Sequence, residues 1–344
     1  MLKRVCLFVV MLMMLASVAW SADGTFEVPV DMQKLMPADA VILAVTTSVN
    51  ELDRHWRQIE EMLDEDSGGG TDILGGIAEY MPQAAAYLDL DRPLALMVGM
   101  PDPMSGQEPA VTLILPVNDA FDDEAMQALE LDDGAVTLRE GDYLALSMDP
   151  AFQPAASLPA LARDLAPGFM SCRVDLDTLL ETLRPLVDMG VAAMAARSAV
   201  PDSSGTAAPA TDAEEIATLQ EMMNAIMDSA RRFDLAMSVE GEELTLFTGF
   251  AVHPGSPLDS GPQPSFEDAL QLTRLLPPGG DIIQAMALDQ TRQFEVFKPY
   301  YLLSLEQGLG EMEAAQAEAY RAWLETYLSS IDLFARPLAA TVAM

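Results

Sequence analysis

Three stretches of the chain repeat one order of apolar and polar positions: a proline-containing turn, an apolar run of strand length and a polar residue that can start a helix. The first stretch starts at 35–39, the second at 165–168 and the third at 275–279. The second reaches its polar residue at Asp175 and the third at Asp289. An apolar run followed by helical periodicity is typical of a strand that leads into a helix. We therefore predict a recurring strand-and-helix building block.

The first predicted helix has both a start signal and an apolar face. Ser48 is followed three residues later by Glu51, the spacing of a capping box, which satisfies free N–H groups at a helix start. Apolar residues then follow at helical spacing: Leu52, Trp56, Ile59 and Leu63. A single apolar stripe of this period predicts an amphipathic helix with one buried face.

The second and third predicted helices share a pair of residues. Asp175 and Asp289 are the predicted N-caps, and each is followed ten residues later by the proline of a basic-proline pair, Arg184-Pro185 and Lys298-Pro299. A shared pair at equal offset indicates common ancestry of the two segments. Each proline removes a backbone N–H, so we expect a kink or a break in both helices.

The remaining elements complete the pattern. Second helices are predicted at 72–87, 212–230 and 311–328. Antiparallel strands are predicted at 94–99, 110–116, 135–139 and 143–148 in the first block, at 233–239 and 244–252 in the second, and at 282–288 and 336–339 in the third. Gly141 and Gly241 mark hairpin turns. The predicted fold class is α+β, with tandem units of strand-helix-helix followed by antiparallel hairpins and helices packed on one sheet face.

The N-terminus has the pattern of an export signal. Lys3 and Arg4 precede an apolar run over 5–18, and Ala19 and Ser21 are small residues at the positions that signal peptidase recognises. We expect cleavage after Ser21. A retained anchor is the alternative, but the run is shorter than the roughly 20 apolar residues that span a bilayer. The sequence thus predicts an exported protein, periplasmic or extracellular, with no integral membrane span after cleavage.

The predicted organisation is a signal peptide at 1–21, a first α+β unit at 22–152, a second at 153–264 and a third, incomplete unit at 265–344. The third unit ends on a predicted strand with no hairpin partner after it, which leaves an unpaired edge. We favour truncation of the chain as the reason. The alternative is that the third unit lends its strand to a neighbouring sheet.

Composition narrows the classes of function. The chain has 54 Asp and Glu against 18 Lys and Arg, a formal net charge of -36, which repels a phosphate backbone and excludes nucleic-acid binding. Beyond residue 4 the only lysines are Lys34 and Lys298, and the other basic residues are sparse arginines. The sequence therefore has no polybasic stretch that could hold an anionic lipid surface. Signal cleavage leaves only Cys172, which excludes an intrachain disulfide.

Residues that often carry catalysis are few. The histidines, His55 and His253, lie outside any zinc-ligand spacing, and His55 one turn after Glu51 is expected to form a surface pair with it. Cys172 stands beside Arg173, which would lower a thiol pKa, but it lies in an apolar run where a small buried side chain is the ordinary role. We assign no catalytic and no cofactor-binding residues.

Acidic clusters supply the only candidate metal ligands. Asp64 and Asp66, and Asp122 and Asp123, offer the hard oxygen atoms that calcium prefers. Gly68 falls where a calcium loop requires an oxygen ligand, and the Asp122 cluster opens a short helix, where carboxylates complement the helix dipole. We favour a solvated acidic surface over a calcium site.

The chain resembles a loose group of uncharacterised, exported bacterial envelope proteins in which Leu-Pro-Ala-Asp strand-helix units repeat. The resemblance rests on 35–39 (Leu-Met-Pro-Ala-Asp), 90–93 (Leu-Asp-Arg-Pro) and 115–119 (Leu-Pro-Val-Asn-Asp). It implies an envelope location and this architecture, without site residues. We expect a non-catalytic module that binds or scaffolds a protein or another envelope component. The alternatives are a hydrolase with an Asp/Glu pair and an acidic, calcium-dependent surface module.

Overall fold

The computed structural model describes residues 26–63, 86–100, 109–122, 125–126, 135–198, 210–241, 243–259, 261 and 282–286, with short pieces between 292 and 342. The chain divides into two compact units. We call the first, residues 22–179 and 233–248, the sheet unit, and the second, residues 180–232 and 249–344 with 1–21, the helical unit.

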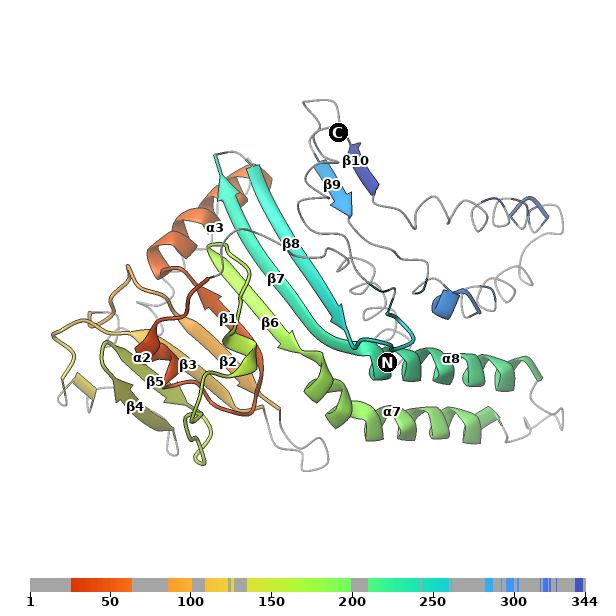
Figure 1. The fold of residues 1–344 in the computed structure, drawn as a ribbon, viewed down its shortest axis with the longest axis horizontal. Coiled ribbons are helices and arrows are strands. Elements are labelled where there is room, and N and C mark those ends of the chain that lie inside the picture. The colour runs from red at the N-terminus through yellow and green to blue at the C-terminus, as the bar shows by residue number, and fades with distance from the viewer. Residues whose placement is uncertain are drawn as a thin grey trace. The chain divides into compact units, whose positions relative to one another are not determined.

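The main element of the sheet unit is an eight-stranded sheet (Figure 1). The first residues of its strand β7 and the last residues of its strand β8 are assigned to the helical unit. The order of the strands in the sheet is β4-β5-β3-β2-β1-β6-β7-β8. The strands are β1 (Ala40–Thr46), β2 (Ala95–Gly99), β3 (Val111–Pro116), β4 (Val136–Glu140), β5 (Tyr143–Ser147), β6 (Met170–Asp175), β7 (Ala230–Glu240) and β8 (Glu243–Val252). The pairs from β4 to β6 are antiparallel. The fold is therefore α+β with a mainly antiparallel sheet, as expected from the sequence.

One face of this sheet forms the core of the sheet unit. Because side chains alternate between the two faces of a strand, the cross-strand register aligns buried residues into rows. One row is Leu43, Met97, Thr112 and Ser147, and the next is Val45, Ala95, Ile114 and Ala145. The period-two runs of the sequence thus become two continuous buried rows.

The cover over this core has little regular structure. It comes from α2 (Val30–Gln33), a helix of four residues, and from the segment 152–165, which includes the 3-10 turn η1 (Ala160–Ala162). Met32, Leu161 and Leu165 pack there against the strands. Hydrophobic periodicity does not predict such short elements, because a single turn carries no repeat.

Two of the three predicted helix starts are confirmed, and the third, at Asp289, lies outside the described residues. The helix α3 (Val49–Leu63) begins where the Ser48 Oγ accepts a hydrogen bond of 3.0 Å from the Glu51 N–H. The helix α7 (Leu176–Ser198) begins where an Asp175 carboxylate oxygen accepts from the Thr178 N–H at 3.2 Å. Both caps satisfy N–H groups that lack a partner within the helix.

The sequence predicts a kink or a break at Pro185, and the prediction of a break is wrong. The helix α7 continues through Pro185 to Ser198. The carbonyl that loses its partner is four residues earlier, at Glu181, and both residues are exposed, so solvent can take the place of the missing N–H. The next helix, α8 (Ala210–Ser229), matches the predicted 212–230 and buries Leu219, Met222, Met223, Ile226 and Met227.

The remaining predicted strands are confirmed to within a few residues. In the helical unit, β9 (Ile282–Met286) pairs antiparallel with β10 (Leu338–Val342), so the last predicted strand has a partner. The helix predicted at 72–87 lies outside the described residues, except for its last two positions, which form a turn. The helix predicted at 311–328 also lies mostly outside them.

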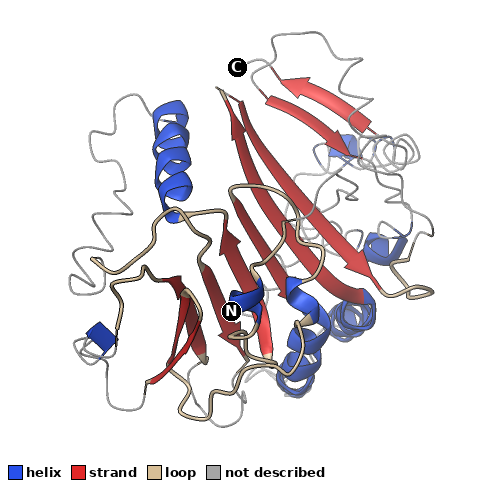
Figure 2. Ribbon diagram, turned by 60° about the vertical axis from the view of Figure 1, so that its left-hand side comes forward, coloured by secondary structure: helices blue, strands red, loops and turns tan. Residues whose placement is uncertain are grey.

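The first and second predicted units share one sheet. Strand β1 pairs antiparallel with β6 over five residues, from Ile42 opposite Val174 to Thr46 opposite Met170. The hairpin of β7 and β8 extends beyond the shorter strands (Figure 2). The sheet therefore ends on two different kinds of strand, β4 with five residues and β8 with ten.

Candidate functional site

The outer edge of β8 is the most prominent unpaired feature among the described strands. No described strand lies on its far side, although the strand is ten residues long. Leu244 is 39% and Leu246 is 56% exposed, and Thr245 between them is exposed as well. The strand contains neither proline nor lysine, the residues that commonly protect an edge. This edge therefore presents backbone groups and apolar side chains together.

The opposite edge, β4, is braced by side chains. The guanidinium of Arg139 lies 5.6 Å from the centroid of the Phe121 ring and donates to the Phe121 carbonyl. Its Nε also donates to the Gly141 carbonyl at 3.2 Å. Lys34 forms an ion pair with Glu140 at the end of the strand. Charge and short length are the usual protections of an edge strand.

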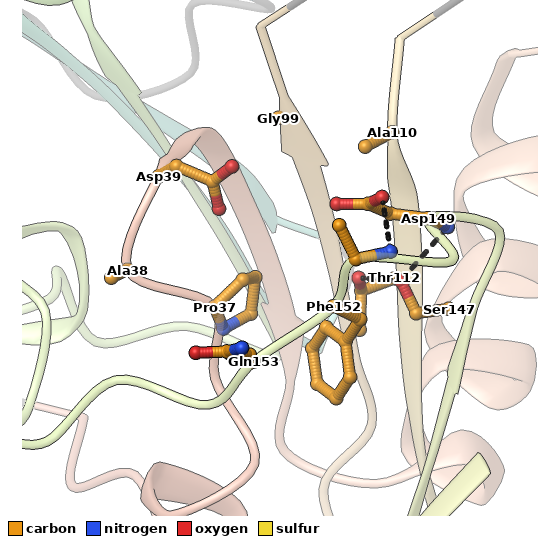
Figure 3. A pocket seen from close by; sticks show the side chains of 11 residues that line it. Pro37, Ala38, Asp39, Gly99, Ala110, Thr112, Ser147, Asp149, Phe152 and Gln153 are labelled. Atoms are coloured by element: carbon orange, nitrogen blue, oxygen red, sulfur yellow. Dashed lines mark hydrogen bonds between the residues drawn. The ribbon is translucent and has the colours of Figure 1, made fainter. Parts of the chain in front are cut away.

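A cavity of about 210 Å³ opens at the end of the sheet where β1 and β3 begin and β2 and β5 end (Figure 3). Its lining includes Pro37, Asp39, Thr112, Ser147, Asp149 and Phe152. Figure 3 shows the two carboxylates coming from different loops, Asp39 before β1 and Asp149 after β5. Sequence reasoning missed both, because they are 110 residues apart in the chain and no local motif joins them.

The hydroxyl groups in this cavity are already engaged. The Ser147 Oγ lies 2.9 Å from the Thr112 Oγ1, and both residues are buried. The Ser147 Oγ also accepts from the Asp149 N–H at 3.2 Å, while an Asp149 carboxylate oxygen accepts from the Ala151 N–H at 2.8 Å. The partner of Ser147 is a hydroxyl and not a base, so the cavity offers two carboxylates but no activated nucleophile.

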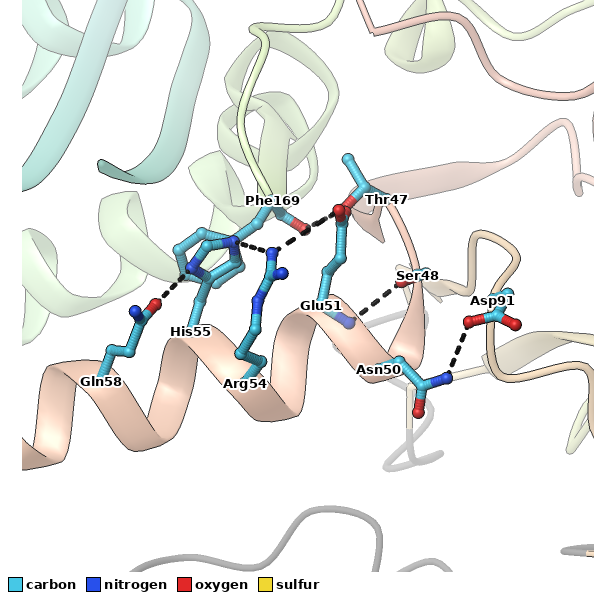
Figure 4. Close-up of polar contacts among 9 residues, drawn as sticks. All are labelled: Thr47, Ser48, Asn50, Glu51, Arg54, His55, Gln58, Asp91 and Phe169. Carbon is cyan, nitrogen blue, oxygen red and sulfur yellow. Dashed lines mark hydrogen bonds and ion pairs between the residues drawn. The ribbon is translucent and has the colours of Figure 1, made fainter. Parts of the chain in front are cut away.

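A second, open depression of about 420 Å³ lies at the start of α3 and is lined by polar residues (Figure 4). Asn50 donates to an Asp91 carboxylate oxygen at 2.8 Å, and Thr47 donates to Glu51. Arg54 lies 3.7 Å from Glu51. The carboxylates are thus paired with neighbouring donors, and the depression has the character of a hydrated helix end.

The expected surface pair of His55 with Glu51 is wrong. The His55 ring stacks on Phe169, with centroids 4.9 Å apart. Its Nδ1 lies 2.9 Å from the Gln58 Oε1 and its Nε2 lies 3.0 Å from an Arg54 nitrogen. Since a guanidinium only donates, the Nε2 accepts and the Nδ1 carries the hydrogen. The aromatic contact, made by a residue far away in the sequence, turns the ring away from Glu51.

A buried ion pair joins β6 to β7 within the sheet unit. Arg173 is 2% exposed and donates through its Nε to Asp234, which is 13% exposed. Its other nitrogens donate to the carbonyls of Leu161, Arg163 and Asp164. Asp164 has a φ of 50°, so this side chain holds a left-handed turn of the cover over the core. The role is structural, since these contacts are internal to the fold.

The remaining predicted site residues have ordinary surroundings. Burial, with the nearby Asp234 carboxylate, raises the pKa of the Cys172 thiol, which keeps it protonated and unreactive. Asp122 accepts from the Ala125 N–H at 2.9 Å, as a residue that opens a short helix should. The described residues contain no group of three or more possible metal ligands. Asp64, Asp66 and Asp123 lie outside the described residues, so a calcium site there stays a prediction.

Comparisons of this chain with protein-family models, with curated proteins and with solved structures find no match. Among the helices that the structure describes, none combines the length and the apolar character needed to cross a bilayer.

Proposed function

We propose that this protein is an exported envelope component that acts as a non-catalytic binding or scaffolding module. The observation that carries the proposal is the outer edge of β8, along which no other described strand lies. A strand of ten residues with exposed Leu244 and Leu246 stands at the end of a sheet whose other edge is short and braced. Unprotected edges invite pairing with another chain, and proteins normally blunt them unless pairing is their role.

Export is supported by the N-terminal pattern, with its basic start, apolar run and small residues at 19 and 21. The test is to fractionate cells that express the full chain and to determine the N-terminal residue of the mature protein. Ala22 is expected at the N-terminus of material outside the cytoplasm. Full-length protein confined to the cytoplasm would contradict export, and full-length protein in the membrane fraction would indicate a retained anchor.

The proposal includes tandem use of one building block. Strand β1 leads into α3 and then pairs with β2, while β6 leads into α7 and α8 and neighbours β7. The third predicted unit repeats part of this order, since β9 pairs antiparallel with β10. The same local plan in three places supports duplication, and scaffolds commonly arise by repetition of a unit.

The binding role is tested in the cells that produce the chain. A photo-crosslinking amino acid replaces Leu246 on β8 in one variant and Leu138 on β4 in a matched control. Both residues are exposed leucines on edge strands. Crosslinked adducts in the envelope fraction are expected for position 246 and not for position 138. Equal yields at the two positions, or no adducts at either, would overturn the proposal.

One observation favours a second candidate, the hydrolase with a pair of carboxylates. Asp39 and Asp149 line the same cavity at the end of the sheet. Two carboxylates in one cavity are the arrangement that acid-base hydrolysis uses. Hydrolysis of chromogenic glycosides and esters that falls in both Asp39→Asn and Asp149→Asn would support it. Identical rates in the parent and both variants would remove this candidate.

A further inference from the structure

We infer that the outer edge of β8 receives an extended, basic segment of a partner polypeptide as an added antiparallel or parallel strand. This inference rests on the proposed binding function and names the chemistry of the partner. It has three grounds: the unused backbone of the edge, the side chains beside it and the charge of the chain.

The backbone supplies the binding groups. In a sheet, a strand directs its N–H and C=O groups alternately to its two sides, so an end strand of ten residues has about half of them unpaired by the ladder. Among the described strands, β8 pairs with β7 alone, which uses one of its two sides. An added strand would satisfy the outer groups along a length that β4, with five residues, does not offer.

The side chains favour a partner with alternating apolar residues. Leu244 and Leu246 are two residues apart and therefore point to the same face of the sheet, with Thr245 on the other. Cross-strand neighbours on one face lie about 5 Å apart, close enough for direct contact. A partner strand with Val, Ile or Leu at every second position would bury both leucines and place its polar residues beside Thr245.

Charge disfavours a second copy of the chain and favours a basic partner. The sequence that joins β7 to β8, Glu-Gly-Glu-Glu over 240–243, is acidic, and β8 itself has no Lys or Arg. The whole chain carries -36, so two copies repel each other as they approach. A segment with Lys or Arg beside its apolar residues is attracted instead, and this attraction weakens as salt screens it.

The probe is a synthetic peptide of alternating Val and Thr flanked by Lys, added to the full chain and followed by fluorescence anisotropy. A peptide with Glu in place of Lys tests charge, and a Lys peptide methylated on alternate backbone nitrogens tests strand addition. Binding of the Lys peptide is expected, weakened about tenfold by the change to Glu, because charge complementarity favours the basic partner. Methylation is expected to abolish it, because an N-methyl group removes the N–H donor.

Leu246→Lys on β8 is expected to weaken binding of the Lys peptide, while Leu138→Lys on β4 leaves it unchanged. Equal binding of the methylated peptide would overturn strand addition, and equal or tighter binding of the Glu peptide would overturn the basic partner. No binding of any peptide would overturn the inference but leave the proposed function standing if position 246 still crosslinks in cells. If a variant fails to fold by circular dichroism, the three peptides on the parent chain decide the matter alone.

Discussion

The two edges of the sheet differ in length, in side-chain bracing and in the packing of their hairpin turns. Strand β4 has five residues and carries Arg139, whose guanidinium packs over Phe121. Its hairpin turn at Gly141 packs so closely on α2 that an added Cβ would lie 2.3 Å from an Asp31 carboxylate oxygen. Strand β8 has ten residues, and no described heavy atom lies within 4 Å of a Cβ built at Gly241 in its turn. Among the described strands, one sheet thus combines a braced edge with an edge that no other strand covers.

The buried residues of the sheet also differ between the half near β4 and the half near β8. Toward β4, the buried rows are mostly apolar, with Ile114 and Ala145 in cross-strand contact and the Thr112 and Ser147 hydroxyls paired. Toward β8, the sheet depends on the ion pair of Arg173 with Asp234. A buried ion pair is sensitive to loss of either partner, whereas an apolar row loses stability in proportion to the volume removed. The following variants test this difference.

Arg173→Met is expected to have the largest effect. It leaves the Asp234 carboxylate and three carbonyl groups without their buried donor. Removing one member of a buried pair costs about 3–5 kcal/mol of the free energy of unfolding. Urea denaturation measures the change, and Arg173→Met with Asp234→Leu should recover part of the loss. A loss below about 1 kcal/mol would mean that the pair behaves like a surface salt bridge.

Ile114→Ala tests the apolar half. The side chain is fully buried between Ala95 and Ala145, so its truncation creates a cavity. The expected loss is about 3 kcal/mol in the same urea experiment. Leu96→Ala is the matched control, because Leu96 lies on the same part of the sheet but is partly exposed. Similar losses for the two variants would contradict the assignment of the core to one sheet face.

Arg139→Ala tests the brace on β4. It removes the contact with the Phe121 ring and the donors to two carbonyl groups at an exposed position. The expected loss is about 1 kcal/mol, the usual value for such contacts near solvent. The variant should also increase peptide binding at β4 in the anisotropy experiment. Unchanged stability together with unchanged binding would show that the brace does not close this edge.

The pKa of Tyr143, which pairs with Glu140 of β4, tests how strongly water is excluded from this part of the sheet. Burial raises the pKa of its phenol to about 12, above the ordinary value of 10.0. The folded state therefore holds the proton more tightly than the unfolded state. The resulting stabilisation is full below pH 10 and is lost as the pH rises from 10 towards 12. The difference in phenolate absorbance between the parent and Tyr143→Phe measures this pKa, and a midpoint near 10 would contradict a dry environment.

Local sequence was sufficient for most of the elements. The capping groups at Ser48 and Asp175 and the hairpin around Gly241 were predicted and are present. These features depend on residues that are close in the chain, so their signals are local. His55 was predicted wrongly because its stacking partner, Phe169, comes from a distant segment.

The amino-acid sequence alone determined the strands, the helix starts, the acidic character and the predicted export signal, because periodicity, capping and composition act within short stretches of chain. Only the tertiary structure decided that Arg173 is buried against Asp234, 61 residues away, and that Asp39 and Asp149 line one cavity. It also decided which strand stands at an open edge. These properties belong to contacts between distant residues, and no local pattern encodes which strands become neighbours.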